Sequence, residues 1–144
     1  MNSKIKHGYD ALLALRSLSD RATAVAASAA GGQVVDLHRL TAGRGDLKNM
    51  YGQTPFDVIV VVDAATGDAA LKVQTVDAAG ANPVDAPGGS IDAAALIGSV
   101  VVLKFDPATL KAADDDAAGI RIYAELGSGA SVSYYAFAAP NSKA

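Results

Sequence analysis

Few residues of this chain have types and spacing that could do chemistry. Asp36 and His38 stand two residues apart, so they share one face of an extended segment, and with a serine they would imitate a hydrolase triad. The second histidine, His7, stands far away in the sequence, and no glycine-flanked nucleophile accompanies the pair. We therefore interpret Asp36 and His38 as a solvated strand face and expect that the protein is not an enzyme.

Two further motifs resemble ligand sites without completing them. Residues 114–116 are aspartates that offer hard oxygen ligands to Ca²⁺, but they lack the alternating spacing and distal glutamate of a calcium loop. Gly88 and Gly89 are followed by Ser90 and not by the Lys-Ser pair of a phosphate-binding loop. The sequence predicts a solvated acidic turn at the aspartates, and we expect no metal and no other cofactor.

The tripeptide Arg44-Gly45-Asp46, known from integrin ligands, lies in the polar stretch from Thr41 to Pro55. A glycine-containing turn carries such a tripeptide by chance more often than for a function. A loop of this length in a small domain, however, is usually functional or mobile. We expect the loop as a whole to matter more than the tripeptide.

Composition excludes several classes of partner. The 144 residues fit one domain, and their net charge of −3 argues against nucleic acid, whose affinity comes from Lys and Arg at the phosphates. The chain has no Cys, so disulfides and thiolate zinc sites are excluded. Residues 1–10 lack the apolar core of a signal peptide, and no apolar run approaches the roughly 18 residues of a membrane span. We expect a protein made in the cytoplasm, with no membrane and no small-molecule substrate as partner.

Phe56 to Asp63 is the strongest strand signal. Its apolar residues occupy both faces of an extended chain, which is typical of a strand in the middle of a packed layer or beneath a partner. Because the neighbouring alternating strands offer enough apolar surface to cover it, we expect its Val and Ile side chains to lie in the core. Alternating apolar and polar residues predict further strands at Gln33–Leu40, Ala69–Asp77, Ser99–Asp106, Gly119–Leu126 and Ala130–Ala138.

The connections follow from the breaks between these strands. We expect one hairpin from Phe56–Asp63 to Ala69–Asp77 and another formed by the last two strands. Residues 78–92 read as a long connecting loop, because Pro and Gly recur in them. Short helical turns are predicted at 91–97 and 107–116, and residues 9–18 fit either a short helix or an extended arm.

These elements indicate an all-β fold, a jelly-roll-like antiparallel β-sandwich of about 7–8 strands with an N-terminal arm or short helix. The absence of Trp and of a Cys pair favours a jelly roll over an immunoglobulin-like sandwich. We divide the chain into an arm (1–22), one sandwich domain (23–139) and a C-terminal tail (140–144).

The order of the strand motifs resembles that of the cement (decoration) proteins of tailed-bacteriophage capsids, in particular the jelly-roll cement protein of short-tailed Bordetella phages. The resemblance covers about Leu12 to Ala138. It is carried by Leu18-Ser19-Asp20, the segment Val34 to Leu37, and the strings FDVIVVVD, AALKVQTVD, VVLKFDP and RIYAEL.

The resemblance implies a structural virion protein on the outer surface of the assembled capsid. Its expected partners are the major capsid protein, whose neighbouring subunits it would tie together, and a second copy of itself in a homodimer. The alternative is a receptor- or carbohydrate-binding β-sandwich of a phage tail or fibre. Such modules usually bind through a platform of aromatic side chains, and the absence of Trp counts against this alternative.

Contact residues are predicted by type and position, because loops and arms reach neighbours and Tyr and Arg are frequent interface anchors. The candidates for capsid contact are Lys4, Lys6, Arg44, Lys48 and Tyr51. The candidates for the dimer interface, expected to face outward from the final hairpin, are Tyr123, Tyr134 and Tyr135.

Overall fold

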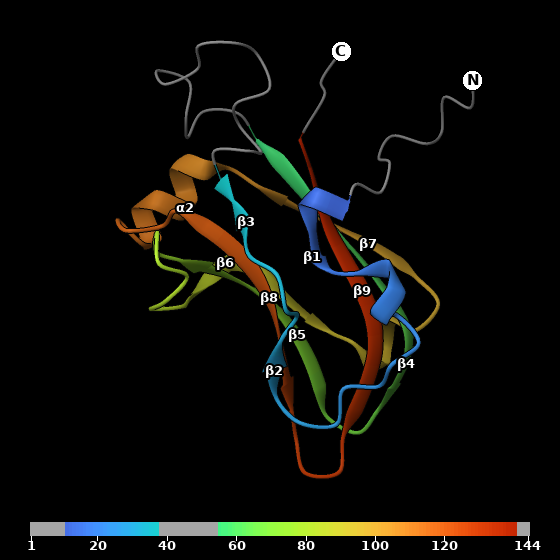
Figure 1. Ribbon diagram of the computed structural model, residues 1–144. Helices are drawn as coiled ribbons and strands as arrows, with labels where there is room; N and C mark the ends of the chain where they lie inside the picture. The colour runs from blue at the N-terminus through green and yellow to red at the C-terminus, as the bar shows by residue number, and fades with distance from the viewer. Residues whose placement is uncertain (1–10, 38–54, 141–144) are drawn as a thin grey trace, which may run out of the picture.

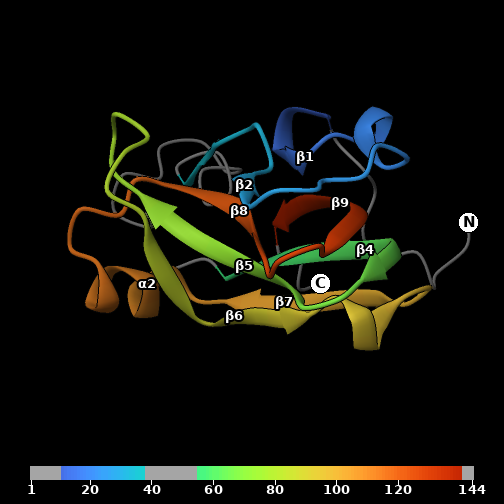
Figure 2. The ribbon, with the colours of Figure 1, turned by 90° about the horizontal axis from the view of Figure 1, so that it is seen from below.

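The computed structural model describes residues 11–37 and 55–140, which form two antiparallel sheets packed face to face (Figure 1). The first sheet contains, in spatial order, β1 (Ala14–Arg16), β9 (Ser131–Pro140), β4 (Phe56–Thr66) and β7 (Val100–Phe105). The second contains β2 (Ala29–Ala30), β8 (Gly119–Leu126), β5 (Ala69–Val76) and β6 (Val84–Asp92), and β3 (Val35–Asp36) also pairs with β8. Viewed from below, β8 and β5 lie beside β9 and β4 (Figure 2).

The pairing runs from the ends of the chain inward. β1 pairs with β9, β2 and β3 pair with β8, β4 pairs with β7, and β5 pairs with β6. This nested order, divided between two sheets, is the jelly-roll arrangement. The predicted fold class is therefore confirmed.

Both predicted hairpins are wrong, because their turns cross from one sheet to the other. β4 belongs to the first sheet and β5 to the second, and the loop from β8 to β9 at the bottom of Figure 1 crosses back. Hydrogen bonds join these two turns. Gly127 N–H donates to the Asp68 carbonyl at 2.8 Å, and the Thr66 and Ser131 hydroxyl oxygens are 2.8 Å apart. Alternation fixes which face of a strand is buried, but not which strand lies next to it.

Residues 84–92, predicted as loop, form β6 at the edge of the second sheet. An edge position tolerates Pro87 and the following glycines, and the pairing with β5 shifts register between Lys72 and Gln74. The true hairpin loop is closed by Asp77, whose carboxylate accepts hydrogen bonds from the N–H groups of Ala79 and Ala81, each at 2.9 Å.

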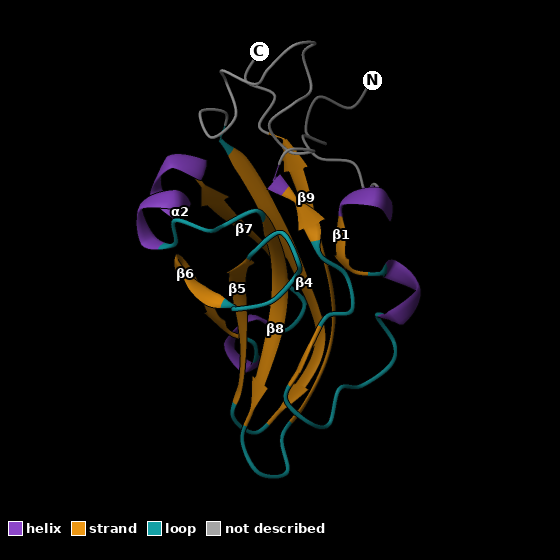
Figure 3. Ribbon diagram, turned by 60° about the vertical axis from the view of Figure 1, so that its left-hand side comes forward, coloured by secondary structure: helices purple, strands orange, loops and turns teal. Residues whose placement is uncertain are grey.

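Helices are short and lie at the margins of the sandwich (Figure 3). They are η1 (Ala11–Leu13), η2 (Leu18–Asp20), η3 (Ala94–Leu96) and α2 (Pro107–Ala113). Asp106 caps α2 by accepting from Ala108 N–H at 3.0 Å, and Pro107 occupies its first turn, where a missing N–H costs nothing. Residues 9–18 were predicted as helix or extended arm, and the described part contains both: η1 is followed by β1, so part of segment 1–22 lies within the first sheet.

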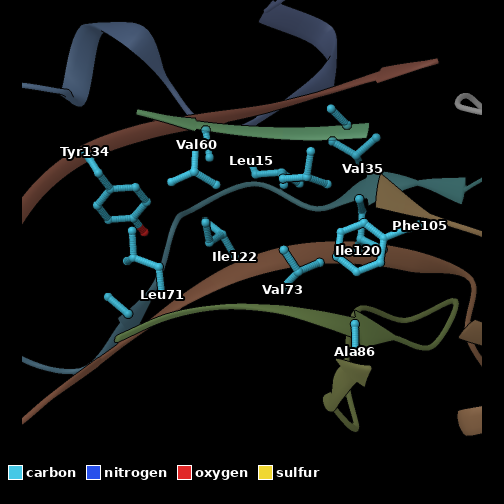
Figure 4. Packing of buried hydrophobic residues seen from close by; sticks show 14 of the residues in the cluster. Leu15, Val35, Val60, Leu71, Val73, Ala86, Phe105, Ile120, Ile122 and Tyr134 are labelled. Atoms are coloured by element: carbon cyan, nitrogen blue, oxygen red, sulfur yellow. The ribbon is translucent and has the colours of Figure 1, made fainter. Parts of the chain in front are cut away.

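The core fills the space between the sheets (Figure 4). Its largest fully buried side chains come from six strands, from α2 and from Leu37 just after β3: Tyr134, Phe56, Leu15, Leu37, Leu71, Leu110, Ile120, Ile122, Val35, Val58 and Val60. Phe56 stacks on Phe105 with ring centroids 5.7 Å apart. The predicted strand Phe56–Asp63 is confirmed and extends to Thr66, with residues 56–60 buried on both faces.

Candidate binding surface

The outer face of the first sheet is apolar across three neighbouring strands. The register places Ile59 of β4 between Val102 of β7 and Phe137 of β9. Two residues further along, Val61 lies between Val100 and Tyr135. We call this surface the apolar face; its six residues are Ile59, Val61, Val100, Val102, Tyr135 and Phe137.

Exposure on the apolar face is concentrated on β7. Phe137 and Ile59 are 6% and 3% exposed, whereas Val102 and Val100 are 42% and 65% exposed. The rings of Tyr135 and Phe137 stack with centroids 6.3 Å apart, which fixes the β9 side of the surface. Because interface cores are rich in aromatic and aliphatic side chains, the exposed β7 side has the composition of a docking surface.

One ion pair borders the apolar face. Asp63 occupies a β-bulge in the pairing of β4 with β9, and its carboxylate accepts from Arg21 at 2.7 and 2.6 Å. The guanidinium carbon of Arg21 lies 4.8 Å from the Tyr135 ring centroid. The hydrogen bonds from Arg21 lower the pKa of Asp63 and raise that of Arg21. This pair holds Tyr135 in place without adding net charge to the apolar face.

The two edges of the first sheet are finished differently. At one edge lies the short strand β1, which ends at Arg16. The buried Arg16 guanidinium donates to the carbonyls of Tyr134 at 2.9 Å, Thr23 at 3.0 Å and Asp20 at 2.6 Å. The bond to Tyr134 satisfies a β9 carbonyl where β1 has ended, and the other two bonds tie the 20–23 segment to this edge. At the other edge stands β7, which pairs with β4 alone among the described strands.

The outer face of the second sheet is polar and internally paired. Lys72 Nζ lies 2.5 Å from the Glu125 carboxylate and 3.5 Å from that of Asp85. Gln74 donates to Asp85 at 2.9 Å and accepts from Arg121 at 3.0 Å. We call this surface the charged face; its core residues are Lys72, Gln74, Asp85, Arg121 and Glu125. The polar groups of the charged face are therefore paired with one another.

A shallow groove of about 510 Å³ opens at one end of the charged face. Three carboxylates, those of Asp68, Asp92 and Glu125, line it. Among the described residues, no group of three His, Cys, Asp or Glu side chains is arranged to hold a metal ion. The predicted acidic turn at residues 114–116 is partly used in folding, since Asp114 accepts from the Thr75 hydroxyl at 2.8 Å.

The tyrosines predicted for a dimer interface do not share a surface. Tyr134 was expected to face outward, but it is fully buried and points into the core beside Leu71 (Figure 4). Tyr135 lies on the apolar face and Tyr123 on the opposite side of the sandwich. Consecutive strand residues point to opposite faces, so Tyr134 and Tyr135 cannot both face outward.

The predicted capsid contacts lie outside the described residues: Lys4, Lys6, Arg44, Lys48 and Tyr51, as do His38 and the tripeptide 44–46. The exposed Val100 and Val102 were missed by sequence reasoning, although the run Val100 to Leu103 is apolar on both faces. That signal was read in β4 and could equally have been read here.

Comparison with protein-family models, curated proteins and solved structures finds no match. No helix in the described part of the chain has the length and apolar character needed to cross a membrane. The two outer faces and the order of the strand motifs are the features that bear on function.

Proposed function

We propose that this protein is a capsid cement protein that binds the outer surface of an assembled phage shell and ties major capsid protein subunits together. The observation that carries the proposal is the one-sided surface of the sandwich. The apolar face leaves Val100 and Val102 in solvent, whereas the charged face is closed by its own ion pairs. The order of the strand motifs along the chain supports the same assignment.

A one-sided sandwich suits this role physically. A contiguous apolar patch on a protein surface marks an interaction site, and here the patch spans three hydrogen-bonded strands, so that little entropy is lost on binding. A protein that binds the assembled lattice but not free subunits stabilises the lattice by mass action. If the protein acts as a homodimer, two weak contacts made together gain roughly 10²–10⁴ in avidity.

Co-sedimentation with empty shells that lack this protein tests the proposal. We expect saturable binding to shells and no binding to free major capsid protein subunits. Decorated shells should also break at a higher temperature than bare ones. If the protein stays in the supernatant but binds glycans saturably, the receptor- or carbohydrate-binding alternative replaces the cement function.

The apolar face provides a matched pair of variants for the same assay. Val102→Lys places a charge on the apolar face, and Val84→Lys places it on β6, where Val84 is similarly exposed at 37% against 42% for Val102. We expect Val102→Lys to lose shell binding and Val84→Lys to retain it. Equal loss in both variants would remove the apolar face from the proposal.

A further inference from the structure

Strand edges offer unpaired N–H and C=O groups to any extended chain, and most edges of this sandwich are protected. β1 and β2 have three and two residues, too few to guide a partner strand. β6 is longer, but Pro87, two following glycines and a shift in register break its edge, and α2 packs against it. Such features are the usual protection against unwanted strand pairing.

β7 has none of these interruptions, and Lys104 is its one charged residue. Its six residues, Val-Val-Val-Leu-Lys-Phe, contain no Pro and no Gly, and all six pair with β4 in unbroken register. Val101 and Leu103 point toward the core and yet are only partly buried, unlike Val58 and Val60 on the neighbouring strand, which are fully buried. An added strand beside β7 would complete the burial of Val101 and Leu103.

We propose that the free edge of β7 binds an extended segment of a partner protein by β-strand addition. Backbone hydrogen bonds along β7 supply the common part of the affinity, and alternate side chains of the segment supply specificity. Val100 and Val102 would pack against β-branched apolar side chains on the outer side of the segment. This inference rests on the proposed function only for the identity of the partner, which would be the major capsid protein.

Charge defines the segment further. Lys104 is exposed on the same face as Val102, beside the free edge of β7. A carboxylate in the bound segment, opposite Lys104, is therefore the complementary group. A second copy of this chain fits less well, because β7 contains one lysine and no acidic residue.

The probe is a short capped peptide of alternating Thr and Val with Glu near each end, so that either strand direction can place Glu beside Lys104. A peptide with Lys in place of Glu tests charge, and one that is N-methylated at alternate residues removes the backbone donors. Hydrogen exchange of the β7 amides reports binding at the edge. We expect the Glu peptide to protect β7 amides and the N-methylated peptide to protect none.

Three variants of the full chain sharpen the test. Lys104→Glu should reverse the preference between Glu and Lys peptides, by about threefold to fivefold in each direction. Val102→Lys should weaken binding of the Glu peptide, and Val84→Lys on β6 should bind it like the wild type. Thermal unfolding of each variant shows that the sandwich is intact.

Two results would overturn the inference. One is the absence of β7 protection at millimolar peptide; the other is self-association of the free chain that Val102→Lys abolishes, which would make a second copy the occupant. Peptide failure with normal shell binding would reject only this inference. Peptide binding without shell binding would instead reject the cement function.

Discussion

The two outer faces of the sandwich differ in character, although both belong to antiparallel sheets. The outer face of the first sheet is apolar, and that of the second sheet is a network of paired charges. Both sheets already bury their inner side chains in one core, so folding alone does not require an apolar exterior. Val100 and Val102 nevertheless stay in solvent, while Lys72 and Arg121 find partners on their own sheet. Under the proposed function, the first sheet is the one that meets a partner and the second is the one that faces water.

Phe137 tests how much the buried part of the apolar face contributes to the free energy of unfolding. Phe137→Ala should cost about 3 kcal/mol or more of unfolding free energy, because Phe137 is 6% exposed and stacks on Tyr135. Tyr123→Ala, on the opposite face, should cost about 1 kcal/mol or less. Urea unfolding of both variants measures the contrast. Equal losses would show that the two faces do not differ in burial.

Arg16→Met tests the closed edge of the first sheet. The change leaves three carbonyl groups without their donor, two of them partly buried and one buried, so we expect a loss of about 2–4 kcal/mol. Arg121→Met is the control on the charged face and should cost less, since Arg121 donates one hydrogen bond to a side chain, that of Gln74, and Arg16 donates three to backbone carbonyls. A small loss in Arg16→Met would mean that water replaces the guanidinium at this edge.

Tyr134 makes the free energy of unfolding depend on pH in the alkaline range. Burial raises the pKa of Tyr134 from 10.0 to about 12. Between these values the unfolded chain releases the phenolic proton while the folded chain keeps it, so unfolding free energy should fall by about 1.4 kcal/mol per pH unit. Tyr134→Phe should remove this fall, and Tyr135→Phe should keep it, as alkaline urea titrations can measure.

The Tyr134 hydroxyl has no hydrogen-bond partner in the core. Phenylalanine therefore removes an unsatisfied buried group, and below pH 10 we expect Tyr134→Phe to be at least as stable as the wild type. A marked loss of stability there would show that the hydroxyl is hydrogen-bonded in solution.

The smallest effects on stability come from the exposed ion pairs of the two faces. One of these contributions is lost at low pH and the other at high pH. Asp63 has its pKa lowered below 3.8 by the hydrogen bond from Arg21, so its contribution is present above pH 3.8 and lost as pH falls further. Lys72 has its pKa raised above 10.5 by the hydrogen bond to Glu125, so its contribution is lost as pH rises beyond that value.

Asp63→Asn and Lys72→Gln isolate these two contributions. The stability difference from the wild type should vanish at low pH for Asp63→Asn and at high pH for Lys72→Gln. Both differences should shrink in high salt, because the groups are exposed and screened. A difference that persists at the wrong end of the pH range would contradict the assigned partner.

Sequence patterns predicted faces well and neighbours poorly. Ile120 and Ile122 face the core as their alternation indicates, and β4 is buried on both sides as its continuous apolar run predicts. The partner of each strand depends on contacts between residues far apart in sequence, about which alternation carries no information. That is why β5 was assigned to a hairpin with β4 when its neighbours are β6 and β8.

The binding surface was partly hidden for the same reason. Val100 to Leu103 has the pattern of a central strand, and only the pairing shows that it is an edge strand with two valines in solvent. β6 presents the reverse case, because Pro87 and its glycines argued against a strand until the edge position explained them. The alternation around residue 134 does predict that Tyr134 and Tyr135 point apart.

Electron cryomicroscopy of decorated shells shows which side of the sandwich meets the lattice. We predict that β7 and the apolar face lie against the major capsid protein, with Lys72 and Glu125 of the charged face in solvent. Density that places the charged face on the shell, or shells that remain bare after saturation with the protein, would contradict the account.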